Sequence, residues 1–151
     1  MVRARPVDTM GWREWVSLPE LEIGAIKAKA DTGARTSSLH AFGVEWFEVD
    51  GAPWVRFEVH PVQRTRWAAR MVELPVIARR KVKSSTGHVQ ERPVIRTKVC
   101  LNDRTWPIEI TLTDRDEMGF RMLLGRAALR RKFLVDPGRS FLMSDPRGGS
   151  S

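Results

Sequence analysis

The sequence of 151 residues predicts an all-β fold. Two segments that alternate polar and apolar residues flank Asp50-Gly51, a dipeptide typical of β-hairpin turns. A second pair of alternating segments lies between residues 94 and 112, and only residues 125–132 have a helical pattern. Apolar residues make up 42% of the chain and charged residues 29%, so the chain can bury a core.

The first expected strand ends at an acidic residue. Residues 25–30 alternate Lys with Ala or Ile, which predicts a strand that runs directly into Asp31. Residues 45–49 and 54–59 alternate on either side of the Asp50-Gly51 turn, which predicts the first hairpin.

Two further turns are expected in the second half of the chain. Residues 74–83 predict a strand that enters a turn of small residues at 84–87 and returns from Val89. Residues 94–101 and 106–112 predict a hairpin across 102–104. Its alternation predicts one buried face and one charged face, made respectively by Ile95, Thr97, Val99 and Leu101 and by Arg96 and Lys98.

The last elements are short. Residues 122–124 predict an apolar strand, and one short helix is expected after Gly125-Arg126. Residues 1–143 are expected to form a single domain, since this length suits one core. The remaining residues, 144–151, are expected to form a disordered tail.

Composition excludes several classes of protein. No apolar run approaches the roughly 20 residues that span a bilayer, so no membrane segment is expected. The first eight residues carry positive charge without an apolar stretch, which is unlike a secretory signal, and a cytoplasmic location is expected. The one cysteine, Cys100, excludes an internal disulfide and a multi-cysteine zinc site.

The positive charge is concentrated in one segment. The formal net charge is +8, and residues 64–98 contain ten Lys or Arg against two acidic residues. Such a segment attracts anionic partners, whether nucleic acid, acidic peptide or phosphate. It is equally consistent with a solvated sheet edge whose charges prevent aggregation.

Two motifs carry the candidate chemistry. Asp31-Thr32-Gly33-Ala34 follows the first expected strand, and Gly125-Arg126 lies between an apolar strand and the short helix, 94 residues after Asp31. A carboxylate at a strand end beside a glycine suits the floor of a cleft, although the same tripeptide also begins ordinary turns.

The pair of motifs resembles the retropepsin-like aspartic peptidases. The similarity extends over four blocks, residues 27–41, 57–61, 109–115 and 122–142, and is closest to the bacterial RimB-type family, some members of which carry the label ATP-dependent zinc protease. The resemblance implies a closed retropepsin-like (acid protease) β-barrel. It also implies hydrolysis by two aspartates that share one proton, one acting as base on water while the other hydrogen-bonds the substrate carbonyl.

The zinc and ATP labels have no counterpart in the residues. The chain has no His-Glu-x-x-His motif, and His40, His60 and His88 are widely separated. It also has no Gly-x-x-x-x-Gly-Lys-Ser/Thr loop for a nucleotide. No metal or cofactor is therefore expected. His40 is the histidine nearest the Asp31 motif, and either a structural position or a place beside the cleft is open to it.

The chain holds a single Asp-Thr-Gly motif, so the resemblance implies a homodimer in which each copy contributes Asp31. The other acids considered, Asp114 and Asp116, lack a following glycine. In such a dimer Thr32 would brace the opposing loop, and Gly33 would let the substrate backbone approach.

Substrate contacts are expected from Ala34, Arg35, Arg126 and a flap at residues 82–89, with Ser84, Ser85 and Gly87 at its tip. In many retropepsins an acid pairs with the arginine of the Gly-Arg element, but this chain has Arg35 at the position of that acid. Either Arg126 has another partner, or both arginines face an anion. An exposed Arg35 paired with a surface acid is equally open. With Lys81, Lys83, Arg92 and Arg96 over the cleft, an acidic substrate is favoured. The resemblance suggests poly-glutamate tails added by ATP-grasp ligases, with a ribosomal protein or such a ligase as partner.

Two other functions remain open. The basic segment could make the chain a nucleic-acid-binding or ribosome-binding β-barrel, with Trp54 or Trp67 stacking on bases, although nucleic acid is not favoured. The chain could also be a peptidase-derived scaffold that docks a partner without catalysis.

Overall fold

The computed structural model describes residues 6–62, 68–83, 85–115 and 119–147. Within these ranges it contains twelve strands, one 3-10 helix (η1, Pro19–Leu21) and one α-helix (α1, Arg126–Leu129). The strands are β1 (Asp8–Gly11), β2 (Arg13–Leu18), β3 (Ile23–Asp31), β4 (Ser37–His40), β5 (Phe42–Val49), β6 (Ala52–Val59), β7 (Arg70–Pro75), β8 (Ala78–Lys83), β9 (Val89–Leu101), β10 (Arg104–Thr113), β11 (Met122–Gly125) and β12 (Phe133–Asp136).

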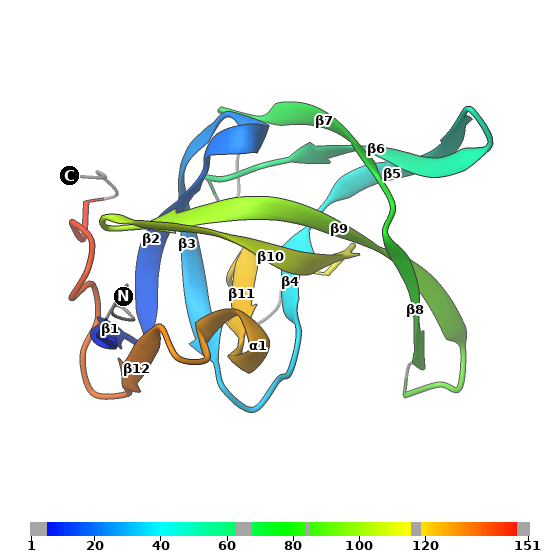
Figure 1. Cartoon of the computed structure of the whole chain (residues 1–151). Coiled ribbons are helices and arrows are strands. Elements are labelled where there is room, and N and C mark those ends of the chain that lie inside the picture. The colour runs from blue at the N-terminus through cyan, green and yellow to red at the C-terminus, as the bar shows by residue number, and fades with distance from the viewer. Residues whose placement is uncertain (1–5, 63–67, 84, 116–118, 148–151) are drawn as a thin grey trace, which may run out of the picture.

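Six strands close into a barrel. They are hydrogen-bonded in the order β10-β4-β11-β3-β2-β9, and β9 pairs in turn with β10 to complete the ring (Figure 1). Strand β8 extends this sheet beyond β9. The prediction of an all-β, closed barrel with one short helix is confirmed, although α1 has four residues rather than the eight expected.

Alternation along the strands fills the barrel with apolar side chains. Ile95, Thr97, Val99 and Leu101 of β9 are buried, while Arg96 and Lys98 are exposed, as the sequence predicted. Strands β3, β4, β10 and β11 contribute Ile26, Leu39, Ile110 and Leu124 to the same core. Removal of this apolar surface from water is the main stabilising contribution to the fold.

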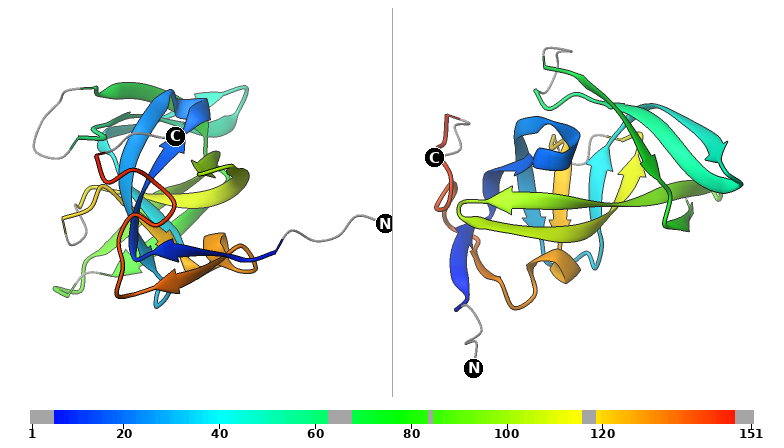
Figure 2. Two further views of the ribbon diagram at one scale, coloured as in Figure 1. Left: turned by 90° about the vertical axis from the view of Figure 1, so that its left-hand side faces the viewer. Right: turned by 45° about the horizontal axis from the view of Figure 1, so that its top comes forward.

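Both predicted hairpins form. Strands β5 and β6 pair across Asp50 and Gly51, whose φ angles of 51° and 80° suit the turn that two-residue hairpins prefer. Together with β7 they make a separate three-stranded sheet that extends to one side of the barrel (Figure 2). Strands β9 and β10 pair across Asn102 and Asp103.

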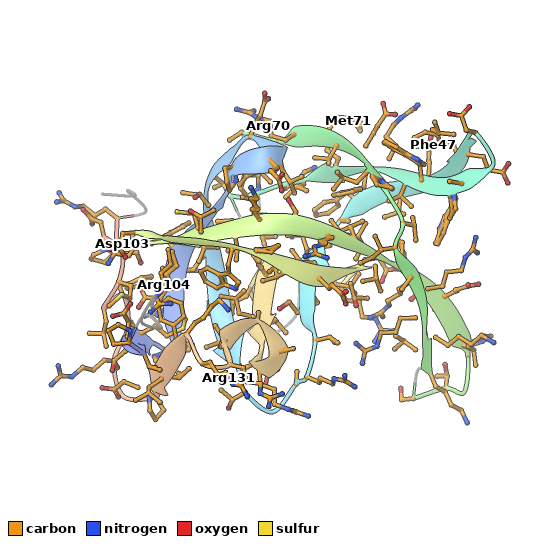
Figure 3. The ribbon with its side chains drawn as sticks, in the orientation of Figure 1. Phe47, Arg70, Met71, Asp103, Arg104 and Arg131 are labelled. Carbon is orange, nitrogen blue, oxygen red and sulfur yellow. The ribbon has the colours of Figure 1, made fainter. Side chains whose placement is uncertain are left out.

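The second hairpin has a shorter turn than predicted. Arg104 was expected in the turn but belongs to β10, where its side chain is buried and bonds Asp8 at 2.9 Å. Figure 3 shows Arg104 beside β1. It also shows Phe47 on the sheet of β5, β6 and β7, which we call the outlying sheet. The Asp8 carboxylate explains why a charged residue occupies a buried strand position.

The single strand predicted for residues 74–83 was wrong. The structure has β7 and β8 there, in two different sheets, because the chain crosses between sheets at Val76 and Ile77. The Val76 amide donates to Pro53 of β6 at 2.9 Å, and the Ile77 amide donates to Val94 of β9 at 2.9 Å. Neighbouring amides therefore bond different sheets, which sequence alternation alone does not reveal.

The two ends of the described chain lie together. Strand β1 pairs in parallel with β12, a pairing that the sequence analysis did not anticipate. The segment after β12 is also held in place, because the Trp15 amide donates to the Ser144 hydroxyl at 2.9 Å and the Trp15 indole to the Pro146 carbonyl at 3.2 Å. Hydrogen bonds therefore reach into the segment where a tail was expected from Ser144.

No helix among the described residues has the length and apolarity to cross a membrane.

Candidate active site

Asp31 is the last residue of β3, and its position is set by β11. These two strands run in parallel, with Asp31 opposite Gly125 in their register. Asp31 is half-buried, whereas Thr32 and Gly33 are exposed. The chain turns immediately after Asp31, where the Ala34 amide donates to the Asp31 carbonyl at 3.2 Å. The carboxylate is thus held on a short turn at the end of a barrel strand.

The Gly125-Arg126 element packs directly against this turn. The Arg126 amide donates to the Ala34 carbonyl at 2.8 Å, and the Ala127 amide donates to the Arg35 carbonyl at 3.0 Å. The Gly125 amide donates to the buried Ser37 hydroxyl at 3.0 Å. The two motifs that the sequence separates by 94 residues therefore form one unit.

Gly125 is required by this close approach. A Cβ atom at this position would lie 2.5 Å from the Thr36 carbonyl carbon and oxygen and 2.8 Å from the Arg35 carbonyl oxygen. These are backbone atoms, which cannot move aside as a flexible side chain can. Gly33 is less constrained, because a Cβ there would lie at an ordinary contact distance of 3.4 Å from Oδ1 of Asp31.

Arg126 has backbone partners. Its Nη1 donates to the Gly33 carbonyl at 3.1 Å and approaches the Thr32 carbonyl at 3.4 Å. The partner of this guanidinium is not evident from the sequence, because Arg35 occupies the position where many retropepsins have an acid. Two carbonyls of the Asp31 turn are thus partners of Arg126, whose side chain is otherwise exposed, as is that of Arg35.

Two cavities flank the Asp31 turn. One, of about 360 Å³, lies between Thr32 and an apolar surface made by Leu129, Phe133, Leu134, Val135 and Pro137, with Arg126 and Arg130 at its edge. Leu134 there is 64% exposed. The other, of about 450 Å³, is lined on one side by Arg35, Thr36 and Ser37 and on the other by Arg96 and Ile108. Arg35 thus lines a cavity beside the turn.

The predicted flap corresponds to the end of the β8–β9 hairpin. Ser85 and Gly87 are exposed in its turn, and Gly87 has a φ of 87°, while Ser84 lies outside the described residues. In the middle of β8, away from the hairpin tip, the Arg80 guanidinium donates a hydrogen bond to the hydroxyl of Thr36, which follows the Asp31 turn. Arg80 was not among the predicted site residues, because the alternation of residues 78–83 does not indicate which face of the strand is turned toward the site.

The histidines do not gather at a site. His40 and His60 are buried and stack on either side of Phe42, with ring centroids 4.2 and 3.9 Å from it. Nη1 of Arg121 lies 2.8 Å from Nδ1 of His40, and Nε2 of His60 lies 2.8 Å from a carboxylate oxygen of Glu58. These contacts give His40 a packing role.

Of the remaining candidates, those that the structure describes line neither cavity beside the Asp31 turn. His88 is exposed near the tip of the β8–β9 hairpin. Asp114 is exposed at the end of β10, and Trp54 is half-buried on β6. Asp116 and Trp67 lie outside the described residues. In the part of the chain that the structure describes, no group of three or more His, Cys, Asp or Glu side chains could hold a metal ion.

Comparison with known proteins identifies the family. The model of the RimB-like family, described as "Retropepsin-like aspartic endopeptidase RimB", matches residues 9–146. The chain belongs to the RimB-like family. This confirms the resemblance on which the closed barrel and the Asp31 motif were interpreted.

Relatives of this RimB-like chain include longer proteins. It is 48% identical over 134 residues to a protein of Shewanella halifaxensis and 50% identical over 128 residues to one of Desulfotalea psychrophila, both named "Probable alpha-L-glutamate ligase". The matches cover 89% and 85% of this chain but 29% and 28% of those proteins. The chain therefore spans less than a third of the length of these relatives.

A crystal structure of a Legionella pneumophila protein of unknown function has the same fold. Its TM-score is 0.73 at 31% identity, and the match covers 90% of this RimB-like chain and 98% of the Legionella chain.

Proposed function

We propose that the protein is a homodimeric aspartic hydrolase that cleaves amide bonds in acidic, glutamate-rich peptide tails. The observation that carries this proposal is the unit formed by the Asp31 turn and the Gly125-Arg126 element, in a chain of the RimB-like family. This unit presents a half-buried carboxylate at a strand end, on a turn whose Gly33 carbonyl accepts a hydrogen bond from Arg126.

The homodimer supplies the second carboxylate. The chain contains one Asp-Thr-Gly motif, and the chemistry needs two carboxyl groups. Support comes from the exposed side chain of Leu134, which lines a cavity together with Thr32 of the motif and the buried Leu129 and Phe133. A second copy that covers this surface about a twofold axis would bring its own motif close to the first.

The pair of Asp31 carboxyl groups would act by general acid-base catalysis. One ionised carboxylate accepts a proton from water as the water oxygen attacks the carbonyl carbon, and the other carboxyl donates its proton to the carbonyl oxygen. The tetrahedral intermediate then collapses, the C–N bond breaks, and a proton passes to the leaving nitrogen. The products are a carboxylic acid and an amine, and the pair again holds one proton.

The substrate class is inferred from charge and from the relatives. Arg35 and Arg96 line the cavity beside the Asp31 turn, so an anionic chain is favoured there. Relatives that contain a matching segment are named as glutamate ligases, and addition of glutamate produces an acidic chain. A hydrolase in the same polypeptide as such a ligase is well placed to shorten that chain.

The test compares wild-type protein with Asp31→Asn on a peptide that ends in several glutamates, with products followed by mass spectrometry. We expect cleavage by the wild type and a loss of at least about a hundredfold in Asp31→Asn, since general acid-base catalysis contributes about 10²–10⁴-fold. The melting temperature should be unchanged, because the substitution is isosteric and Asp31 is only half-buried.

The matched control is Asp50→Asn. Asp50 is exposed in the β5–β6 turn, where asparagine also accepts a positive φ, so full activity is expected. Equal cleavage by wild type and Asp31→Asn would reject the assignment. Absence of cleavage together with tight, salt-sensitive RNA binding that survives Asp31→Asn would favour a nucleic-acid-binding barrel instead.

A further inference from the structure

The β8–β9 hairpin has two faces, and its arginines and lysines are divided between them. Directly opposed residues of an antiparallel pair lie on one face, and Arg80 opposes Arg92 while Val82 opposes Gln90. Lys81 opposes Glu91 on the other face. The earlier expectation that Lys81 covers the cleft together with Arg92 is therefore wrong, because neighbouring strand residues point in opposite directions.

The opposite face is occupied by internal contacts. Arg79 lies 3.4 Å from Glu91, and its guanidinium carbon lies 4.5 Å from the ring centre of Trp46 on β5. This face therefore joins the hairpin to the outlying sheet.

The Arg80 face leads toward the Asp31 turn. Arg92 and Arg96 are four residues apart on β9, so alternation places them on the same face. Arg96 lines the cavity that also contains Arg35 and Thr36, and Arg80 donates to the Thr36 hydroxyl. Arg92 lines a second cavity of about 450 Å³, together with Lys83, Arg115 and residues of the hairpin tip.

Four arginines line the two cavities, and Arg80 contacts Thr36 of the first cavity. We call these five residues the arginine track: Arg35, Arg80, Arg92, Arg96 and Arg115. Two acids, Glu109 and Asp114, line the same cavities, so the track keeps an excess of positive charge. Residues 90–96 of β9 span about 20 Å, since a strand rises about 3.3 Å per residue. That length matches about six residues of an extended peptide.

We propose that the arginine track binds the acidic tail of the substrate over about six residues, so that the protein distinguishes long glutamate chains from short ones. This inference rests on the proposed function for the identity of the substrate, but it adds a length requirement and a set of binding residues. Each arginine contributes a partly solvated ion pair, and the contributions accumulate along the chain.

An extended peptide fits the track better than a nucleic acid does. Successive side chains on one side of an extended peptide are about 6.7 Å apart, so carboxylates at every second or fourth residue can meet Arg92 and Arg96. Single-stranded nucleic acids are commonly bound by exposed aromatic platforms. The residues that line the two cavities include no aromatic ring other than that of His88.

Binding is measured on the Asp31→Asn protein, so that turnover does not interfere. The probes are fluorescent glutamate peptides of two, four, six, eight and ten residues, with glutamine peptides of equal length as uncharged controls. We expect at least a tenfold rise in affinity from two to six glutamates and little change beyond eight. Equal affinity for two and ten glutamates would overturn the proposal.

The matched variants are Arg80→Gln and Lys81→Gln, which remove one exposed charge from adjacent residues of one strand. We expect Arg80→Gln to weaken binding of the eight-residue peptide about two- to fivefold, as for a single exposed ion pair. Lys81→Gln should leave it unchanged. Arg92→Gln should behave as Arg80→Gln does, and it provides a second measurement if loss of the Thr36 contact disturbs the fold.

Two further outcomes separate this inference from the proposed function. Length-dependent binding that Arg80→Gln weakens, combined with no cleavage by the wild type, would support the track and reject the hydrolase. Cleavage that depends on Asp31 but is equally affected by Arg80→Gln and Lys81→Gln would support the hydrolase and reject the track. Tighter binding of an eight-nucleotide oligouridine than of eight glutamates, weakened by Arg80→Gln, would also overturn the peptide assignment.

Discussion

The position of Asp31 depends on a glycine that allows close packing and on side chains that hydrogen-bond backbone groups. Gly125 allows the end of β11 to lie against Thr36, and Arg126 donates to the carbonyls of Gly33 and Thr32. The Ser37 hydroxyl accepts a hydrogen bond from the buried Gly125 amide, so this donor is satisfied. The turn that carries Asp31 is therefore held by the Gly125-Arg126 element.

Gly125→Ala should destabilise the protein. The added methyl group would meet backbone atoms at 2.5 Å, and overpacking of this kind costs about 1–3 kcal/mol of unfolding free energy. Urea denaturation measures the change. Gly24→Ala is the matched control, because a Cβ there meets nothing within 4 Å, and its stability should be unchanged or slightly higher. Equal stability of the two variants would contradict the steric argument.

Among the elements, β2 and the C-terminal segment depend on one another through a buried carboxylate. Glu14 of β2 is fully buried and accepts hydrogen bonds from the amides of Gly11, Leu142 and Met143 and from the Ser144 hydroxyl, at 2.6–3.1 Å. An ionised carboxylate is acceptor-only, which suits four donors. Glu14 thereby fixes residues 142–144 against the start of the barrel.

Glu14→Gln should weaken this attachment. The amide group replaces one acceptor oxygen with a donor, so at least one buried donor loses its partner at a cost of about 1–3 kcal/mol. Thermal unfolding followed by circular dichroism should show a lower melting temperature. Glu48→Gln makes the same chemical change at an exposed position of β5 and should have no effect. Identical melting curves for Glu14→Gln and wild type would contradict the role of Glu14.

The molecule as a whole places the Asp31 turn beside two surfaces of different chemistry. The apolar surface around Leu134 adjoins Thr32 on one side, and the arginine track begins at Arg35 on the other. Under the proposed function, the first surface receives a second copy of the chain and the second receives substrate. Leu134 lies on β12, which pairs with β1 outside the barrel, and Arg80 lies on β8, which extends the barrel sheet beyond β9 (Figure 1).

Mixing wild type with Asp31→Asn tests whether the site needs two copies. If dimers form at random and each needs two Asp31 residues, an equal mixture has about half the activity expected from its wild-type content. The measurement is cleavage rate against mixing ratio, after incubation long enough for subunits to exchange. Activity that follows the wild-type content alone, with exchange confirmed by mass, would contradict the shared site.

The local patterns of the chain were sufficient for the hairpins, the buried face of β9 and the Asp31 motif. Each depends on neighbouring residues, because strand alternation, turn conformation and a strand-end acid are properties of short segments. The sequence failed at residues 74–83, where adjacent amides bond different sheets, and it did not anticipate β1 and β2. Those features depend on partners far away along the chain.

The residues 25–31 and 122–126 were enough to expect a strand-end carboxylate and a glycine-arginine element. Only the tertiary structure decided that Arg126 bonds the carbonyls of the Asp31 turn, that Glu14 holds the C-terminal segment, and that Arg80 faces the site while Lys81 does not. The physical reason is that contact between distant segments depends on register and strand twist. A shift of one residue in strand register would turn Glu14, Arg80 and Lys81 to the opposite face of their sheet.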